Sequence, residues 1–331
     1  MLLQGKSITL PRPRKIALKE LRVATSNLKP SEIVAKTLFS AISPGTETAA
    51  YRGDPPLRPG IAYPRLVGYC NVAEVVQVGK FVKTIRPGDR VLTHQSHRSI
   101  FSIQEREVLA RIPKKVPSEE AAVTYLYHLG LNALQTIPLK PELPVAVIGL
   151  GILGLGAVEQ AKNLKLNVSA FSNSQYKLQL AKELGAKKVH LKRKSKKLEN
   201  LANLVITTSN SWEDWRLALR LVRPRGTISV IGFPGRGLKA PNFNPLDPRF
   251  FYYKKISIVP VGVSSIGRTE EEMLSIRKKN CSKILRLMKL KRLNPRRLIS
   301  GIYDYRDIKL AYEKILSKDS RTITYLLKWP K

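Results

Sequence analysis

Three glycines with the spacing of a nucleotide-binding turn carry the clearest chemical signal in the chain. Gly149, Gly151 and Gly154 lie in VAVIGLGILG, after an apolar run and before a helical pattern. In such a turn the first glycine permits the sharp bend, the second lets backbone N–H groups approach a pyrophosphate, and the third lets helix and strand pack closely. The helix N-terminus adds partial positive charge. We predict a dinucleotide cradle formed by Gly149, Gly151, Ile152, Leu153 and Gly154.

The residues after the next strand distinguish two cofactors. NAD-binding proteins place an Asp or Glu about 20 residues beyond the glycines, where it accepts hydrogen bonds from the ribose. Here the strand NVSAF is followed by hydroxyls, an amide and an ammonium, with no carboxylate. These groups can donate to a 2′-phosphate, so the sequence favours NADP(H) over NAD(H). The candidate contacts at this end are Ser172, Asn173, Ser174 and Lys177, and further cofactor candidates are Thr207, Gly232 and Val261.

Residues able to bind a metal are few. Two cysteines, Cys70 and Cys281, exclude a disulfide framework and a four-cysteine zinc lobe. His94 and His97, in HQSH, are an alternative metal pair, but side chains three apart on a strand or loop point in different directions. We expect a polar active-site or surface role for this pair. His128, on a predicted helix, is expected to be a hydrogen-bonded histidine.

The charge of the chain is its compositional outlier. Lys and Arg number 59 against 24 Asp and Glu, which gives a formal charge of +35. Such a field favours anionic partners and nonspecific nucleic-acid contact at low salt. The excess is spread along the chain, and aromatic residues are not interleaved with the basic clusters as stacking platforms would be. We expect a solvated cationic surface, with nucleic-acid contact as the alternative.

No membrane or export segment is evident in the sequence. No apolar run approaches the roughly 20 residues of a membrane span, and the start, MLLQGKSITLPRPRK, lacks the apolar core of a signal peptide. The sequence therefore predicts a cytoplasmic protein without membrane contact.

The pattern of elements predicts two domains. Residues 21–108 are strand-like, with Pro/Gly turns such as SPGTE and RPGD, which indicates a β-rich domain. After a predicted N-cap at Ser118 and the helical segment EEAAVTYLYHLGLNALQ, helices alternate with apolar strands, as in an α/β doubly wound parallel sheet. The tail reads as helix, strand, helix and strand. We predict a β-rich domain at 1–117, completed by 268–331, and a nucleotide-binding domain at 118–267.

Several segments together resemble the medium-chain dehydrogenase/reductase family, the alcohol-dehydrogenase-like enzymes. They are SAISPGTETAAYRGD, YPRLVGYCNVAEVVQVGKFVKTIRPGDRV, VAVIGLGILG, KLQLAKELGAKKV, LRLVRPRGTISVIGF and TITYLLKW. The resemblance covers nearly the whole chain. It implies a GroES-like catalytic domain and a Rossmann domain, NAD(P)-dependent oxidoreductase activity on a small molecule, and a homodimer. ISPGTE and YPRLVGY look like zinc-independent members of the bacteriochlorophyllide-dehydrogenase type.

The departures from the family pattern concern the metal. Zinc members take a cysteine from a Cys-Gly-Thr-Asp step, and the matching stretch here, Ser43 to Glu47, has no thiolate. They take a histidine from a Gly-His-Glu step, where Tyr69 stands here and Cys70 replaces the glutamate. A catalytic zinc needs three protein ligands, so the resemblance implies a member without zinc. Cys70 is then expected to be a small buried residue rather than a ligand or a nucleophile.

Without a metal, hydrogen-bond donors must stabilise a developing oxyanion or enolate. Thr46 matches the family's relay hydroxyl and Tyr69 would project into the metal position, with Ser43 and His94 as further catalytic candidates. The alternatives are that Thr46 only stabilises its turn and that Tyr69 only fills space. Glu47 is expected to orient Thr46 or to pair with a lysine or arginine.

Three functions stay open at this point. The first is an NADP(H)-dependent, zinc-independent alcohol/carbonyl oxidoreductase. The second is a reductase of activated C=C bonds, and the third is a catalytically idle nucleotide- or RNA-binding protein.

Overall fold

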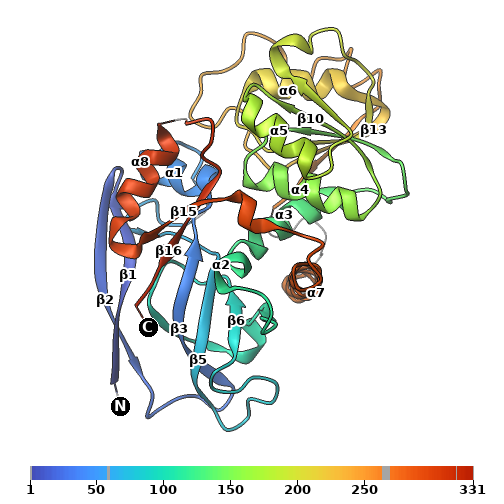
Figure 1. The fold of residues 1–331 in the computed structure, drawn as a ribbon. Coiled ribbons are helices and arrows are strands. Elements are labelled where there is room, and N and C mark those ends of the chain that lie inside the picture. The colour runs from blue at the N-terminus through green and yellow to red at the C-terminus, as the bar shows by residue number, and fades with distance from the viewer. Residues whose placement is uncertain (1, 58–59, 263–268, 318, 331) are drawn as a thin grey trace. The chain divides into compact units, whose positions relative to one another are not determined.

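The computed structural model describes residues 2–57, 60–262, 269–317 and 319–330, which form two compact units (Figure 1). The first unit comprises residues 1–125 and 274–331, and the second comprises 126–273. The domain boundary predicted between 117 and 118 lies eight residues before the division at 125/126. The boundary predicted between 267 and 268 lies outside the described residues.

The second unit is built on a six-stranded sheet whose strand pairs are all parallel. The strand order is β11-β10-β9-β12-β13-β14, so the chain reverses its direction of travel across the sheet beside β9. The strands are β9 (Pro144–Ile148), β10 (Asn167–Ser172), β11 (Lys188–Leu191), β12 (Ala202–Thr207), β13 (Val222–Val230) and β14 (Ser257–Pro260). Ligands of doubly wound sheets bind at the carboxyl ends of the strands beside such a reversal. The predicted α/β class with a doubly wound parallel sheet is confirmed.

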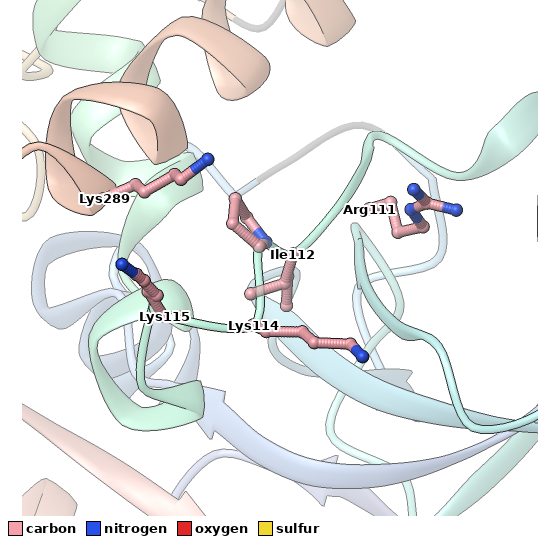
Figure 2. Close-up of a pocket in the computed structure, with 6 residues that line it drawn as sticks. Arg111, Ile112, Lys114, Lys115 and Lys289 are labelled. Carbon is pink, nitrogen blue, oxygen red and sulfur yellow. The ribbon is translucent and has the colours of Figure 1, made fainter.

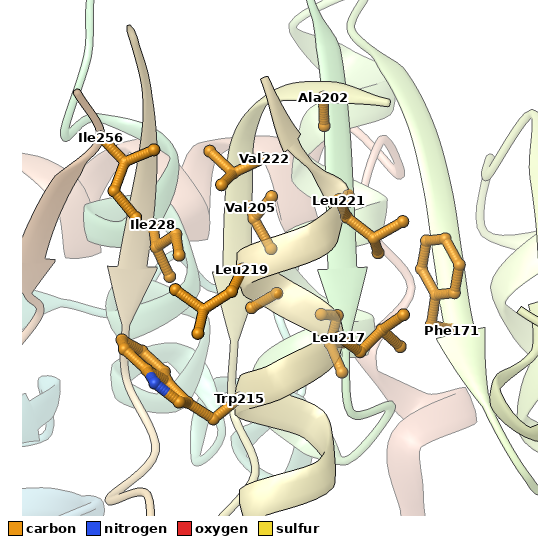
Figure 3. Packing of buried hydrophobic residues seen from close by; sticks show 13 residues of the cluster. Phe171, Ala202, Val205, Trp215, Leu217, Leu219, Leu221, Val222, Ile228 and Ile256 are labelled. Carbon is orange, nitrogen blue, oxygen red and sulfur yellow. The ribbon is translucent and has the colours of Figure 1, made fainter. Parts of the chain in front are cut away.

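Helices connect these strands and bury their apolar faces on the sheet. They are α4 (Ile152–Asn163), α5 (Gln175–Glu183) and α6 (Trp212–Leu221), with the 3-10 turn η2 (Lys192–Lys194) after β11. The helix α3 (Thr124–Leu134) precedes β9 and lies against α4, where a Cβ on Gly130 would be 3.0 Å from the Leu153 carbonyl oxygen. In Figure 3, Trp215, Leu217, Leu219 and Leu221 of α6 pack in one cluster with strand residues such as Val205. The central strands are continuous apolar runs because both faces of a parallel sheet are covered.

Two antiparallel-rich sheets form the β-rich part of the first unit. A three-stranded sheet has the order β2-β1-β4, and a larger one has the order β15-β16-β3-β5-β6-β8 with β7 paired to β3. The strands are β1 (Leu2–Arg12), β2 (Lys15–Ala24), β3 (Glu32–Ala41), β4 (Arg65–Leu66), β5 (Asn71–Val78), β6 (Arg90–Thr93), β7 (Ile100–Gln104), β8 (Ala110–Arg111), β15 (Ile299–Asp304) and β16 (Thr324–Lys328). The C-terminal β16 pairs with β3, so the end of the chain adds a strand to the larger sheet.

Helices and short turns complete the first unit. They are α1 (Pro44–Arg52), α2 (Ser118–Ala121), α7 (Glu270–Lys289, which starts at the end of the second unit), α8 (Ile308–Leu316), η1 (Glu105–Glu107), η3 (Pro295–Leu298) and η4 (Tyr305–Asp307). In the part of the chain that the structure describes, no helix is both long and apolar enough to cross a bilayer.

Two local predictions about helices are wrong. SPGTE is not a turn between strands, because Pro44 occupies the first position of α1 and Gly53, with φ +83°, ends the helix. Ser118 is not an N-cap: Pro117 holds that position, and the Ser118 hydroxyl instead accepts a hydrogen bond from Arg90 at 2.9 Å. The segment predicted as one helix is divided into α2 and α3.

Candidate active site

The glycine turn of the second unit joins β9 to α4. Gly149 has φ +90°, a conformation that favours glycine, and a Cβ there would lie 2.6 Å from Thr208 Oγ1. A Cβ on Gly154 would lie 2.0 Å from the carbonyl oxygen of Gly149, so only glycine lets α4 approach the turn so closely. Gly151, the N-cap of α4, has open space around its Cβ position. The turn is closed where helix meets strand and open at the helix N-terminus, as a pyrophosphate requires.

The other predicted contacts in this region lie at the start of α4 or after the parallel strands. Ile152 and Leu153 open α4. Thr207 ends β12, and its buried hydroxyl has no hydrogen-bond partner among the described residues. A Cβ on Gly232, after β13, would lie 2.4 Å from a backbone oxygen. Val261 follows β14 and continues its backbone pairing with β13 at 2.8 Å. The open turn and the orphaned hydroxyl fit a dinucleotide.

The predicted ribose end lies where β10 ends and α5 begins. The Ser174 hydroxyl caps α5 by accepting the Lys177 N–H at 3.3 Å, and the Ser172 hydroxyl accepts the Ser174 N–H at 3.1 Å. The Asn173 side-chain oxygen accepts the backbone N–H of Arg193 at 3.2 Å. The structure therefore brings these four predicted residues together and adds the basic turn η2. Sequence reasoning missed Arg193, although the basic run HLKRKSKK contains it.

The Asp214 carboxylate beside η2 is paired with a lysine, which reduces its repulsion of an anion at this end of the sheet. Lys192 pairs with Asp214 at 2.7 Å, so this carboxylate is already neutralised. His190 stacks on Phe171 with ring centroids 4.8 Å apart. Burial, with the neighbouring charge of Lys188, lowers the pKa of His190, which keeps the imidazole neutral.

A pair of hydroxyls forms the centre of the candidate site in the first unit. The Tyr69 hydroxyl donates to Ser43 Oγ, and both side chains are buried. The Tyr69 ring meets Tyr125 edge to face, with centroids 5.6 Å apart. Burial raises the pKa of Tyr125 well above its ordinary value. Among the described residues, no atom accepts the Ser43 hydroxyl proton. Thr46 lies half-buried in the first turn of α1, and its hydroxyl has no hydrogen-bond partner in the same residues.

The buried carboxylate of Glu47 holds the Ser43 end of this pair in place. One carboxylate oxygen accepts the Ser43 N–H at 2.7 Å, and the other accepts the Tyr312 hydroxyl at 2.8 Å and lies 2.8 Å from His97 Nε2. The second ring nitrogen of His97 lies 2.8 Å from Ser40 Oγ. We call Glu47, His97 and Tyr312 the Glu47 cluster. In the described ranges, the Glu47 carboxylate bonds to neither the Thr46 hydroxyl nor any lysine or arginine, so that expectation is wrong.

Gly68 connects the Glu47 cluster to Tyr69. Its φ is +85°, and a Cβ would lie 2.6 Å from the His97 ring. The backbone just before Tyr69 therefore rests directly on His97. The cluster holds Ser43 through its N–H and Tyr69 through the adjoining glycine, which sequence reasoning did not foresee.

The buried Nδ1 of His94 has no hydrogen-bond partner in the described part of the chain. His94 follows β6, and its pKa is lowered first by burial and then by the charge of Arg277, against a smaller opposite effect of Glu107. Arg277 also acts electrostatically on Tyr125. The charge of Arg277 therefore acts on both His94 and Tyr125, and the sequence singled out neither Arg277 nor Tyr125.

The remaining singled-out residues have structural surroundings. Cys70 is fully buried, which confirms the expectation of a small buried residue. Burial raises the pKa of the Cys281 thiol to about 12, so this thiol stays protonated. His128 is buried, and its Nε2 lies 3.2 Å from Asn132 Nδ2, which confirms a hydrogen-bonded histidine.

The residues around the hydroxyl pair do not fit a zinc ion. Structural and catalytic zinc sites use three or four thiolate, imidazole or carboxylate ligands. Ser43 and Tyr69 offer hydroxyls, and the only histidine and carboxylate described beside them, His97 and Glu47, bond to each other. Over residues 2–57, 60–262, 269–317 and 319–330, no group of three metal-ligating side chains is found.

Comparison with known proteins gives matches of three kinds. The family model described as "Zinc-binding dehydrogenase" matches residues 153–278, which excludes the Ser43 and Tyr69 segments. An alcohol dehydrogenase from Geobacillus stearothermophilus is 28% identical over 267 residues, covering 70% of this chain and 78% of the relative. The 2-desacetyl-2-hydroxyethyl bacteriochlorophyllide A dehydrogenase of Cereibacter sphaeroides is 29% identical over 161 residues, covering 45% of this chain and 50% of the relative.

Solved structures agree on the fold over the full length. The L-idonate 5-dehydrogenase of Escherichia coli superposes with a TM-score of 0.81 at 14% identity, covering 99% of both chains. With the glycine turn and the parallel sheet, these matches show that the chain has the fold of the medium-chain dehydrogenases and is similar to NAD(P)-dependent alcohol dehydrogenases.

Proposed function

We propose that the protein is an NADP(H)-dependent, zinc-independent oxidoreductase that interconverts an alcohol and a carbonyl compound. The observation that carries this proposal is the hydrogen bond between the Tyr69 and Ser43 hydroxyls. By the family resemblance, Tyr69 stands where zinc members have a ligand histidine, and Ser43 begins the stretch that matches their cysteine step. The pair offers a hydrogen-bond donor where a metal would otherwise polarise the substrate oxygen.

The hydroxyl pair has the polarity that such a role needs. Because Tyr69 donates to Ser43, the Ser43 proton is available for a substrate oxygen, and the bond from Tyr69 strengthens it as a donor. Thr46, three residues further along the chain, offers a second uncommitted hydroxyl. Donors fixed in advance stabilise a developing oxyanion without reorganisation. When bound, the dinucleotide supplies or accepts the hydride.

The choice of NADP(H) is supported by the ends of β10 and β11. Ser172, Ser174 and Lys177 lie beside η2, whose Arg193 backbone bonds to Asn173. A 2′-phosphate here would meet cationic and hydroxyl donors, whereas an NAD ribose would find no carboxylate acceptor among these residues.

The cofactor proposal is tested by the fluorescence of bound NADPH and NADH. Lys177→Gln should weaken NADPH binding about tenfold or more and leave NADH binding unchanged, because a charge-assisted bond to the phosphate is removed. Lys182→Gln, an exposed lysine later in α5, is the matched control and should change neither. Equal loss of both cofactors in Lys177→Gln would contradict the proposal.

The reaction and the metal are tested on the same purified protein. A panel of ketones, aldehydes and enones should show turnover of carbonyl compounds, and reduction of enones alone would assign C=C chemistry instead. Treatment with a chelator, and separately with added zinc, should leave the rate unchanged. A rate that falls with the chelator and returns with zinc would overturn the zinc-independent mechanism.

A further inference from the structure

A hollow of about 470 Å³ in the first unit is lined by four cations (Figure 2). Arg111, Lys114 and Lys115 come from the end of β8 and the segment after it, and Lys289 comes from the last turn of α7, with Ile112 and Pro113 completing the lining. No carboxylate lines it. The three lysines are exposed, and none is in an ion pair with any residue that the structure describes.

A second hollow adjoins the first and shares Arg111 with it. Its lining adds Arg106 and Lys278 and includes one acid, Glu105. That carboxylate already accepts hydrogen bonds from the Thr84 N–H and hydroxyl at 2.8 and 2.7 Å. Asp89, which lines neither hollow, pairs with Arg111 at 3.6 Å. We call the two adjoining hollows the basic groove.

The length of the basic groove follows from helix geometry. Lys278 and Lys289 are eleven residues apart on α7, close to three full turns, so they share one side of the helix about 16 Å apart. One strand of a nucleic-acid duplex carries a phosphate about every 3.4 Å along the axis, so this span matches about five phosphates.

We propose that the basic groove binds the phosphate backbone of duplex nucleic acid without reading its sequence. No aromatic side chain lines either hollow, so bases have no stacking platform and single strands gain nothing from unstacked bases. The cations are exposed rather than enclosed, which suits a polyanion held by several contacts better than a single small phosphate. Counterions released from the duplex provide the driving force, and the +35 charge steers the encounter.

The test is the salt dependence of binding to a fluorescent 20-base-pair duplex, measured by anisotropy. The variant Lys114→Gln, Lys115→Gln, Lys289→Gln removes three cations from the groove. Because three fewer phosphates are then neutralised, the fall in affinity between 50 and 200 mM salt should be about 40-fold smaller than in the parent protein. An unlabelled single strand of the same length should compete less well than the duplex.

The control removes the same charge elsewhere in the first unit. Lys15, Lys19 and Lys309 are exposed, lie on β2 and α8, and do not line the groove. Their triple Gln variant should keep the salt dependence of the parent. If both variants reduce the salt dependence equally, binding reflects the positive charge of the whole surface, and the groove is not a site. The absence of duplex binding at 50 mM salt would also overturn the proposal. NADPH binding by the groove variant reports separately on the proposed enzyme, because these lysines lie outside the nucleotide-binding unit.

Discussion

At the scale of single residues, the hydroxyl pair makes a graded prediction about catalysis. Ser43→Ala removes the donor proposed to face the substrate and should lower kcat about 100-fold. Tyr69→Phe removes the bond that supports Ser43 but leaves the Ser43 hydroxyl in place, so a smaller loss of about tenfold is expected. NADPH binding should be unchanged in both, since these residues lie in the other unit.

The matched control for the hydroxyl pair is Tyr303→Phe, a half-buried tyrosine of β15 in the same unit. Its turnover should equal that of the parent protein. Full turnover in Tyr69→Phe would leave Tyr69 as a filler of space, the alternative that the sequence kept open.

The Glu47 cluster makes a second prediction, which concerns stability. Tyr312→Phe removes one buried donor to the carboxylate and should lower the free energy of unfolding by about 1–2 kcal/mol. Glu47→Ala strands the buried donors of Ser43, Tyr312 and His97 and should cost about 3–5 kcal/mol. Urea unfolding followed by fluorescence measures both. Glu20→Ala, which breaks an exposed ion pair with Lys6, should change little, and a cost equal to that of Glu47→Ala would argue against the cluster.

The same residues show what could be predicted at this scale. Ser43, Thr46 and Tyr69 were found because a family pattern marks their positions. The partnership of Glu47 with His97 and Tyr312 was not found, because it joins segments 50 and 265 residues apart. No local pattern encodes such a pairing, and the sheet and α8 have to fold before these side chains meet.

At the scale of elements, substitutions at two glycines of the β9–α4 turn should have different effects, one on stability and the other on cofactor binding. Gly154→Ala forces a Cβ against the Gly149 carbonyl and should destabilise the second unit by about 1–3 kcal/mol. Gly151→Ala meets no atom in the protein, so it should melt like the parent while its NADPH affinity falls about tenfold or more. Thermal melting and NADPH fluorescence on the two variants check this. NADPH affinity unchanged by Gly151→Ala would remove the cradle as the pyrophosphate site.

A strand or helix was predicted correctly where the local sequence pattern was clear, and it was missed where the pattern fitted two structures. β9, β12 and β13 were found because buried parallel strands are continuous apolar runs between helical patterns. The helix α1 was missed because Pro44 and Gly45 were taken as turn residues. The same residues are compatible with the start of a helix, and Gly53 is compatible with its end. The helix forms here because Ala50 and Tyr51 pack against α8.

At the scale of the whole molecule, charge and acid sensitivity are distributed over both units. The +35 charge indicated an anionic partner from composition alone, but only the fold brings Lys278 and Lys289 of α7 beside Arg111 in the basic groove. The homodimer implied by the family resemblance remains a prediction. Composition can state the sign of a surface field, whereas its concentration at one place depends on tertiary structure.

Each unit also contains one histidine whose pKa is lowered by burial, His94 in the first and His190 in the second. The unfolded chain, with an ordinary histidine pKa of about 6.5, then binds more protons than the folded protein as pH falls. Stability present above pH 6.5 should therefore decrease below it, before the carboxylates with lowered pKa, such as Glu105 and Asp304, begin to protonate. Thermal midpoints at pH 7.5 and 5.5 should differ in the parent and differ much less in His94→Gln, His190→Gln. If the double variant loses as much as the parent over this interval, the acid sensitivity has another origin, because neither imidazole is then available to take up the proton.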